Sequence, residues 1–301
     1  MILTLIAGTA LALPESLPQE EEGLKISNYI NVASLQMTHT FGMEFDSPGA
    51  GDLSFSNLGL FSLLGQYELP GGITWIPSVS YDLSQFNLDG PRTPATTLTP
   101  RLEDPLHQIA FPNFFIRQTD SQWLYGLMVS PSIHSSFDEV NSRDFFLSAG
   151  VGAAYRFSDS LLLGFGVYGV DLTNDPSIFV GPGFVWEIDE NWTSYFYGPR
   201  FVTRRAMGDD RFIGVEAAWN GGEWSTNYAG QDAKIDFNST RAGLIFRQRL
   251  SGELWLDLAA GYSFGNELTI TSPGGRQIIT PGLGDAGGSP YVRVGLSLGT
   301  W

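Results

Sequence analysis

The sequence predicts an all-β fold, a single closed antiparallel transmembrane β-barrel of 14 strands, with 12 strands as the alternative. Three observations predict it: short segments with period-two alternation, tight polar turns that fold neighbouring segments back on each other, and connections that alternate between short and long. In lipid, only helices and closed barrels satisfy their backbone hydrogen bonds. No segment has the roughly 20 consecutive apolar residues that a spanning helix needs, so a barrel is the predicted membrane form.

The clearest hairpin joins 143–157 to 161–172 through the turn Ser158-Asp159-Ser160. With this turn at the centre, one face is apolar: Phe157 pairs with Leu161, Tyr155 with Leu163, Ala153 with Phe165 and Val151 with Val167. The other face is small: Ala154 pairs with Gly164, Gly152 with Gly166 and Gly150 with Tyr168. A soluble sheet covers its apolar face with a core and charges the other face. Here the apolar face is predicted to contact lipid, and the small face to line a lumen.

The same alternation predicts the other strands in order. They are expected at 31–45, 55–69, 73–83, 107–118, 122–135, 143–157, 161–172, 177–188, 192–204, 211–219, 223–229, 239–250, 254–266 and 289–300. The short turns contain the Gly, Asn, Asp or Ser residues that hairpins need: Pro70-Gly71-Gly72, Thr119-Asp120-Ser121, Ser158-Asp159-Ser160, Asp189-Glu190-Asn191, Asn220-Gly221-Gly222 and Ser251-Gly252-Glu253. Longer connections lie between them, the largest at 84–106 and 267–288. Because outer-membrane barrels have short periplasmic turns, both termini are expected in the periplasm.

The two ends of the chain fit an exported bacterial barrel. Residues 1–12 resemble a secretory signal peptide ending in Ala10-Leu11-Ala12, although no Lys or Arg precedes the apolar stretch, and an apolar N-terminal strand is the alternative. Residues 13–30 are predicted to be a mobile acidic lead and 31–301 the barrel. The last strand ends on Trp301 and resembles the signal that the barrel-assembly machinery recognises.

The composition limits which classes of partner and cofactor the chain is expected to bind. The net charge of −16 argues against nucleic acid, whose binding needs clustered Lys and Arg. The chain has no cysteine, which excludes disulfides and thiol chemistry. His39 and His107 are isolated, so neither a metal nor another cofactor is predicted. The expected partners are outer-membrane lipid and lipopolysaccharide, and the oligomeric state is left open.

Charged residues on the small face are the candidate functional residues. In the hairpin of 239–250 and 254–266, Arg247 lies directly across from Asp257, and the same face carries two further arginines. The predicted pore-lining residues are Arg241, Arg247, Arg249, Asp257, Arg293 and Glu216. Opposed charges in a lumen form a solute constriction in one interpretation. In the other they form a buried ion pair that only holds the barrel in shape.

A catalytic alternative rests on His134 and Ser136, which lie two residues apart and share one face of a strand. The outer-membrane phospholipase family has this spacing, with His activating Ser. The His-Asp-Ser-Asn-Gly pattern of that family is absent here. The chain is therefore not expected to be an enzyme.

Several short motifs carry a resemblance: Val180-Gly181-Pro182-Gly183, Trp186, Trp192, Gly198-Pro199-Arg200 and Ala218-Trp219-Asn220-Gly221-Gly222-Glu223-Trp224. In these the chain resembles an uncharacterised bacterial outer-membrane β-barrel family of unknown function. The resemblance implies a fold and an outer-membrane location, and no activity. The strand count then predicts a passive channel for small solutes, since about fourteen strands leave a lumen wider than side chains fill. The alternatives are a non-conducting structural or surface-binding barrel, a lipid-modifying barrel enzyme and a soluble secreted β-sandwich. The face on which Arg200 lies is left open.

Overall fold

The computed structural model describes residues 31–45, 51–89, 104–119, 121–137, 140–173, 176–228, 231–271 and 285–299. The strands are β1 (Ala33–Glu44), β2 (Asp52–Leu63), β3 (Tyr67–Leu69), β4 (Ile73–Asp89), β5 (Leu106–Ala110), β6 (Asn113–Gln118), β7 (Trp123–Ser135), β8 (Phe145–Ser158), β9 (Leu161–Val170), β10 (Ser177–Glu187), β11 (Trp192–Tyr197), β12 (Arg200–Ala206), β13 (Arg211–Tyr228), β14 (Gln231–Ser251), β15 (Leu254–Thr271), β16 (Asp285–Ala286) and β17 (Ser289–Leu298). One turn of 3-10 helix, η3 (Ser142–Asp144), precedes β8. Among these residues no helix has the length and apolarity to cross a membrane. The predicted signal peptide, the acidic lead and Trp301 lie outside the described residues.

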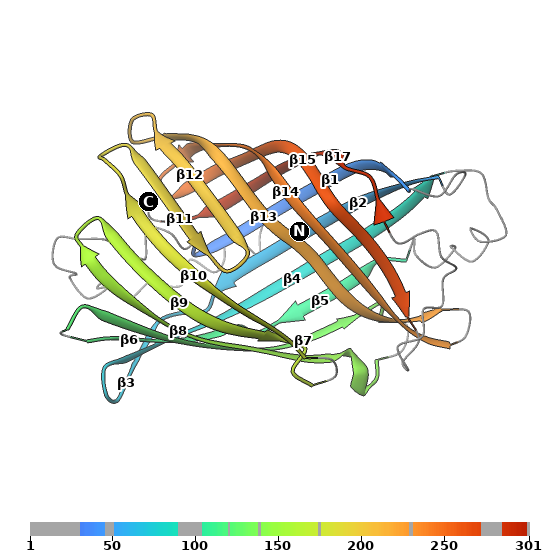
Figure 1. The fold of residues 1–301 in the computed structure, drawn as a ribbon, viewed down its shortest axis with the longest axis horizontal. Coiled ribbons are helices and arrows are strands. Elements are labelled where there is room, and N and C mark those ends of the chain that lie inside the picture. The colour runs from blue at the N-terminus through green and yellow to red at the C-terminus, as the bar shows by residue number, and fades with distance from the viewer. Residues whose placement is uncertain are drawn as a thin grey trace.

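The strands form one antiparallel sheet that closes on itself (Figure 1). Closure is made by the first and last long strands, which pair from Ala33 with Leu298 to Thr40 with Tyr291. Strand β3 lies beside β4 in line with β2, and β5 and β6 share one position between β4 and β7. The wall described here therefore has fourteen positions. The predicted fourteen-strand closed barrel is confirmed, and the twelve-strand alternative is not found.

Two errors in the predicted strands affect the strand count, and they cancel. Other boundary errors leave the count unchanged: β4 runs to Asp89 rather than to residue 83, and β14 begins at Gln231 rather than at residue 239. The predicted strand 192–204 is a hairpin, in which β11 and β12 turn tightly at Gly198-Pro199. Gly198 has a φ of +56°, which a glycine adopts without strain. A glycine followed by a proline is a turn signal that fits this position.

The second error concerns Asn220-Gly221-Gly222, which is not a turn. These residues lie inside β13, which pairs continuously with β14 from Arg211 to Tyr228. The glycines serve close approach instead: a Cβ on Gly221 would meet the carbonyl oxygen of Phe237, and one on Gly222 would meet the Trp224 ring. Glycine in a strand often marks such a site rather than a chain reversal.

The predicted hairpin of β8 and β9 has the expected register except beside its turn. Tyr155 pairs with Leu163, Val151 with Val167 and Gly152 with Gly166, as predicted. At the turn, however, Leu161 pairs with Ser158 rather than with Phe157, because a bulge between Arg156 and Ser158 shifts the register. The bulge adds a residue to one strand and leaves the facing of the rest unchanged.

The outer surface of the barrel is apolar. Exposed large side chains alternate outward along the strands, among them Val151, Phe165, Ile213, Leu244 and Val294. Exposed aromatic residues gather towards the end of the barrel where β6–β11 meet short turns: Trp123, Tyr125, Phe157, Trp186 and Trp192. Exposed Trp219, Tyr262 and Phe264 lie towards the opposite end. No second sheet covers this surface in the described part of the chain.

We call one end of the barrel the turn end; it has the connections after β3, β6, β8, β10, β12 and β14. We call the opposite end the loop end. The predicted alternation of short and long connections holds only in part, because two loop-end connections, 198–199 and 229–230, are also short. The wall is uneven as well. Strands β13 and β14 have 18 and 21 residues, whereas β11 and β12 have 6 and 7. The β11–β12 hairpin therefore stops partway along β13 (Figure 1).

The interior of the barrel at the loop end is filled by an apolar cluster, which we call the plug. Its members are Met43, Phe45, Leu53, Phe55, Phe86, Leu106, Trp224, Ala233, Ile235, Phe237, Leu268, Ile270 and Ala286. Phe55, Phe86 and Phe237 form its centre, with ring centroids 4.8–5.2 Å apart. Side chains this closely packed exclude water, so the plug obstructs the barrel axis at this end.

Candidate internal cavity and its charged wall

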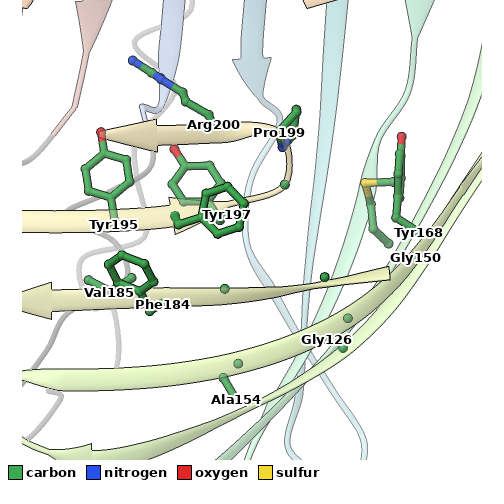
Figure 2. A pocket seen from close by; sticks show the side chains of 18 of the residues that line it. Gly126, Gly150, Ala154, Tyr168, Phe184, Val185, Tyr195, Tyr197, Pro199 and Arg200 are labelled. Atoms are coloured by element: carbon green, nitrogen blue, oxygen red, sulfur yellow. The ribbon is translucent and has the colours of Figure 1, made fainter. Parts of the chain in front are cut away.

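A cavity of about 1250 Å³ lies inside the barrel beside the short hairpin. Figure 2 shows it between the β11–β12 hairpin, with Tyr195, Tyr197 and Arg200, and strands β7–β9, with Gly126, Gly150 and Ala154. Its lining comes from strands of almost the whole circumference. Cavities of this size hold small organic molecules. The cavity has two chemically different walls.

The first wall is apolar and is formed by the inward faces of β6–β10. It contains the small pairs of the β8–β9 hairpin together with larger side chains: Phe114, Ile116, Leu124, Met128 and Tyr168. Glycines keep the space open. A Cβ on Gly126 or on Gly181 would meet no atom within 4 Å.

The second wall is formed by β12–β17 and is charged. Its inward-facing arginines are Arg200, Arg204, Arg241, Arg247, Arg249 and Arg293, as the strand registers place them. Two carboxylates lie among them in this wall, Glu216 and Asp257. All six residues predicted to line a pore thus face the interior of the barrel. Of these, Arg247, Asp257 and Arg293 line the cavity itself. The structure divides the six into two ion-paired groups, with Arg241 and Arg249 beside aromatic rings.

The first group joins Arg247 to Asp257, which pair directly across β14 and β15. The Ser297 hydroxyl donates to Asp257 Oδ2 over 2.5 Å and accepts from Arg247 Nη2 over 2.5 Å. Arg247 also lies over the fully buried Trp255 ring, with Cζ 5.6 Å from the ring centroid. Because its hydrogen bonds fix its orientation, this pair is a rigid part of the wall.

The second group is centred on Glu216, whose side chain is 2% exposed. Its carboxylate accepts from Arg293 Nη1 over 2.7 Å and from Arg200 Nη2 over 3.0 Å. The Tyr291 hydroxyl lies 3.5 Å from Glu216 Oε1. The Glu216 carboxylate on β13 thus binds two arginines from different strands, Arg200 on β12 and Arg293 on β17.

The two remaining predicted arginines contact rings. Arg241 donates to Thr40 Oγ1 over 3.2 Å, and its guanidinium lies over Tyr291 and Phe55, 5.6 and 5.7 Å from their centroids. Arg249 lies over Trp255 at 4.7 Å. Both contacts are cation–π interactions, which stabilise an arginine away from bulk water.

Sequence reasoning missed four residues of this site. Arg200 and Arg204 lie on a strand that was predicted to be continuous with β11, so their facing was not fixed. Tyr291 and Trp255 were not singled out by the sequence pattern. For the two arginines, the Gly198-Pro199 dipeptide was the available signal. If a turn is placed there, the segments before and after it each show inward–outward alternation of side chains.

The catalytic alternative finds no support in the geometry. His134 Nδ1 donates to the Glu223 carbonyl oxygen over 2.8 Å, and its ring stacks on Phe146. Its other ring nitrogen, Nε2, is buried and has no hydrogen-bond partner in the described part of the chain. Neither nitrogen therefore reaches the Ser136 hydroxyl. Among the described residues no three His, Cys, Asp or Glu side chains are grouped as metal ligands.

Comparison with known proteins gives a family and distant structural likenesses. A family model described as "Domain of unknown function (DUF6268)" matches residues 75–299. None of the curated proteins compared with the chain matches it.

Three solved structures illustrate the structural likenesses. An outer-membrane channel from Pseudomonas putida F1 is 11% identical, with 94% of this chain and 99% of that chain covered and a TM-score of 0.43. The Pseudomonas putida toluene transporter TodX is 8% identical, with 91% of each chain covered and a TM-score of 0.38. The KdgM porin is 8% identical, with 89% of this chain and 99% of that chain covered and a TM-score of 0.34. The fold described above rests on the strand pairing of this chain and not on these likenesses.

Proposed function

The chain belongs to the DUF6268 family, a domain of unknown function, and we propose that it is a bacterial outer-membrane channel for small, mainly apolar solutes. The observation that carries the proposal is the cavity, which has an apolar wall inside a barrel whose outer surface is also apolar. A water-filled channel has a polar interior. An apolar lining instead favours a solute that loses little hydration on entering.

The membrane location is inferred from the apolar outer surface of the barrel, which is stable in contact with lipid. Large apolar side chains are exposed on β1, β7–β11, β13–β15 and β17, and exposed aromatic residues gather towards both ends. Bilayers are the environment in which such a surface is stable, with aromatic rings at the two interfaces. We place the turn end and both termini in the periplasm, with lipid and lipopolysaccharide around the barrel and the last strand serving its assembly. These assignments are proposals.

The charged wall gives the cavity one polar side. Its arginines outnumber its carboxylates, and the Glu216 and Arg247 groups are largely buried. Such a wall favours an apolar molecule with a single acceptor group, because arginine offers hydrogen-bond donors and no acceptor. We propose that Arg200, which is 36% exposed, is the arginine that meets the solute.

A second candidate function is a barrel that conducts nothing and serves a structural or surface-binding role. The plug favours it, because the apolar cluster closes the axis at the loop end. The two functions differ in one property: a non-conducting barrel leaves the permeability of the outer membrane unchanged.

The test is uptake of N-phenyl-1-naphthylamine, an apolar dye that fluoresces when it enters lipid, by bacterial cells with and without the barrel. We expect the barrel to raise the initial rate of uptake. Gly126→Trp should abolish this increase in dye uptake, because the tryptophan ring enters the open cavity. Leu244→Trp places the same ring on the outer surface and should leave uptake equal to that of the unsubstituted barrel. Uptake equal to that of cells without the barrel would refute the channel.

A further inference from the structure

The barrel wall contains a seam where two strand edges have no neighbouring strand. Strand β10 pairs with β11 only over Phe184–Glu187, which leaves residues 177–183 unpaired on that edge. Strand β13 pairs with β12 only up to Ala218, and its next strand partner on that edge is Ser135 of β7, opposite Ser225, so residues 220–224 have no partner there among the described strands. The cause is the short β11–β12 hairpin, which fills only the turn-end half of the space between β10 and β13 (Figure 1).

The seam is bounded on all sides, so it is a window and not a split barrel. Its lower boundary is the tight turn at Gly198-Pro199, where Trp219 N donates to the Pro199 carbonyl oxygen over 2.9 Å. Its upper boundary is the contact of β13 with β7 and η3. There Ser225 pairs in parallel with Ser135, the Ser225 hydroxyl donates to the Arg143 carbonyl oxygen over 3.2 Å, and Arg143 forms an ion pair with Asp232.

Two aromatic side chains meet across the window. Phe179 of β10 and Trp219 of β13 have ring centroids 6.4 Å apart and an interplanar angle of 45°. Phe179 is 52% exposed and Trp219 is 46% exposed, so neither ring is held by a surrounding core. Side chains with this much exposure change rotamer rapidly, whereas the backbone hydrogen bonds of a continuous sheet open on a much slower timescale.

The cavity reaches this window from the inside. Its lining includes Phe179, Val180 and Gly181 on the β10 side, and Pro199 and Trp219 on the other side. Gly181 removes any side chain at the point where β10 borders both the cavity and the window. The Phe179–Trp219 pair therefore stands between the apolar cavity and the outside of the wall.

The outside of the window is apolar as well. Ile178 and Val180 are exposed on the outer face of β10. Trp219 pairs with Thr240, which pairs with the exposed Phe264, so the window lies at the level of the loop-end aromatic residues. The Lys234–Glu223 and Arg143–Asp232 ion pairs lie farther towards the loop end. At membrane depth, backbone without a strand partner is tolerated only where it is buried in protein or lines a water-filled cavity.

We propose that the window between β10 and β13 is a lateral passage through which small apolar solutes move between the cavity and the membrane, with Phe179 and Trp219 as its gate. The proposal rests on the proposed function and adds the route. It also accounts for the plug: with the axis obstructed at the loop end, a side opening is the exit that the described wall provides.

The test closes the window with a cross-link. The chain has no cysteine, so Phe179→Cys combined with Trp219→Cys introduces the only two thiols. A bifunctional methanethiosulfonate reagent joins them, and dithiothreitol reverses the link. The matched control is Val215→Cys with Leu244→Cys, a pair that faces outward across the continuous β13–β14 pairing. Uptake of N-phenyl-1-naphthylamine is measured in cells before linking, after linking and after reduction.

We expect linking at the window to lower uptake to the rate of cells without the barrel, reduction to restore it, and the control link to leave it unchanged. Phe179→Ala with Trp219→Ala should raise the rate about two- to twelvefold, since an aromatic pair contributes about 0.5–1.5 kcal/mol and about 1.4 kcal/mol is a tenfold change in rate. Both side chains are exposed, so these variants keep the fold.

Two results overturn the proposal in distinguishable ways. If the linked window still passes the dye while Gly126→Trp abolishes uptake, the barrel is a channel and the route is elsewhere. If the barrel raises dye uptake in no variant, the proposed function fails and the lateral passage with it.

Discussion

Glu216 offers a direct test of how the charged wall contributes to stability. Its side chain is 2% exposed and accepts from Arg293 over 2.7 Å and Arg200 over 3.0 Å. Glu216→Gln keeps the shape of the side chain and removes the charge. The new amide presents a donor group to one of two arginines, neither of which can accept a hydrogen bond.

The size of the effect follows from burial. Removing one partner of a buried ion pair destabilises a protein by about 3–5 kcal/mol, because a charge is left buried without compensation. Arg200 is 36% exposed and is able to turn towards the cavity, whereas Arg293 is 16% exposed and is held. We therefore expect the lower end of the range, about 3 kcal/mol, or roughly a hundredfold change in the unfolding equilibrium.

The matched control is Asp232→Asn, which breaks the ion pair with Arg143. Those two side chains are 52% and 50% exposed. An exposed pair contributes about 0–1 kcal/mol because water and salt screen it. The assay is urea unfolding of the barrel in lipid vesicles, followed by tryptophan fluorescence, with the midpoint and slope compared between variants. Equal midpoint shifts for Glu216→Gln and Asp232→Asn would show that water reaches the Glu216 group and would refute the reasoning.

Three further predictions concern the wall, the plug and the window boundary. Gly261→Ala should destabilise the barrel by about 1–3 kcal/mol in the same unfolding assay, because its Cβ would meet the Ala242 carbonyl oxygen, whereas Gly181→Ala, with open space, should be neutral or stabilising. Phe86→Ala should cost about 3–5 kcal/mol and raise ion conductance in planar bilayers, because it hollows the centre of the plug; unchanged conductance would show that the axis is closed elsewhere. Ser225→Ala removes one hydrogen bond at the upper boundary of the window and should speed uptake of N-phenyl-1-naphthylamine with little effect on the unfolding midpoint; slower uptake would contradict that boundary.

The facing of most side chains was predictable because a period of two fixes it once one residue is assigned. The β8–β9 hairpin shows this: its apolar and small faces both follow from the pattern around one turn. The Arg247–Asp257 pair was predictable for the same reason, since its partner strands flank a short turn.

The β11–β12 hairpin could not be predicted in the same way because its strands are too short to show a period. Six and seven residues with aromatic side chains on both faces resemble one irregular strand. The continuity of β13 was hidden for the opposite reason. Two adjacent glycines resemble a turn locally, and the Phe237 carbonyl oxygen that explains Gly221 lies on the neighbouring strand β14, where the local sequence does not reveal it.

The window was invisible in the sequence because it depends on what is missing between two strands. Each edge has ordinary strand residues, and the seam appears only when the lengths of β10, β11, β12 and β13 are compared in register. The ring contact between Phe179 and Trp219 joins residues that lie 40 positions apart, with the whole short hairpin between them.

The plug has a consequence for how the barrel responds when lipid is removed. Phe55, Phe86 and Phe237 contact one another across strands from both ends of the chain, as the side chains of a water-soluble domain do. That half of the molecule carries its own apolar interior, whereas the half around the glycine pairs depends on the surrounding medium to cover it. In a harsh detergent, hydrogen–deuterium exchange should therefore advance from β8 and β9, while amides of β2 and β14 near the three phenylalanines stay protected longest.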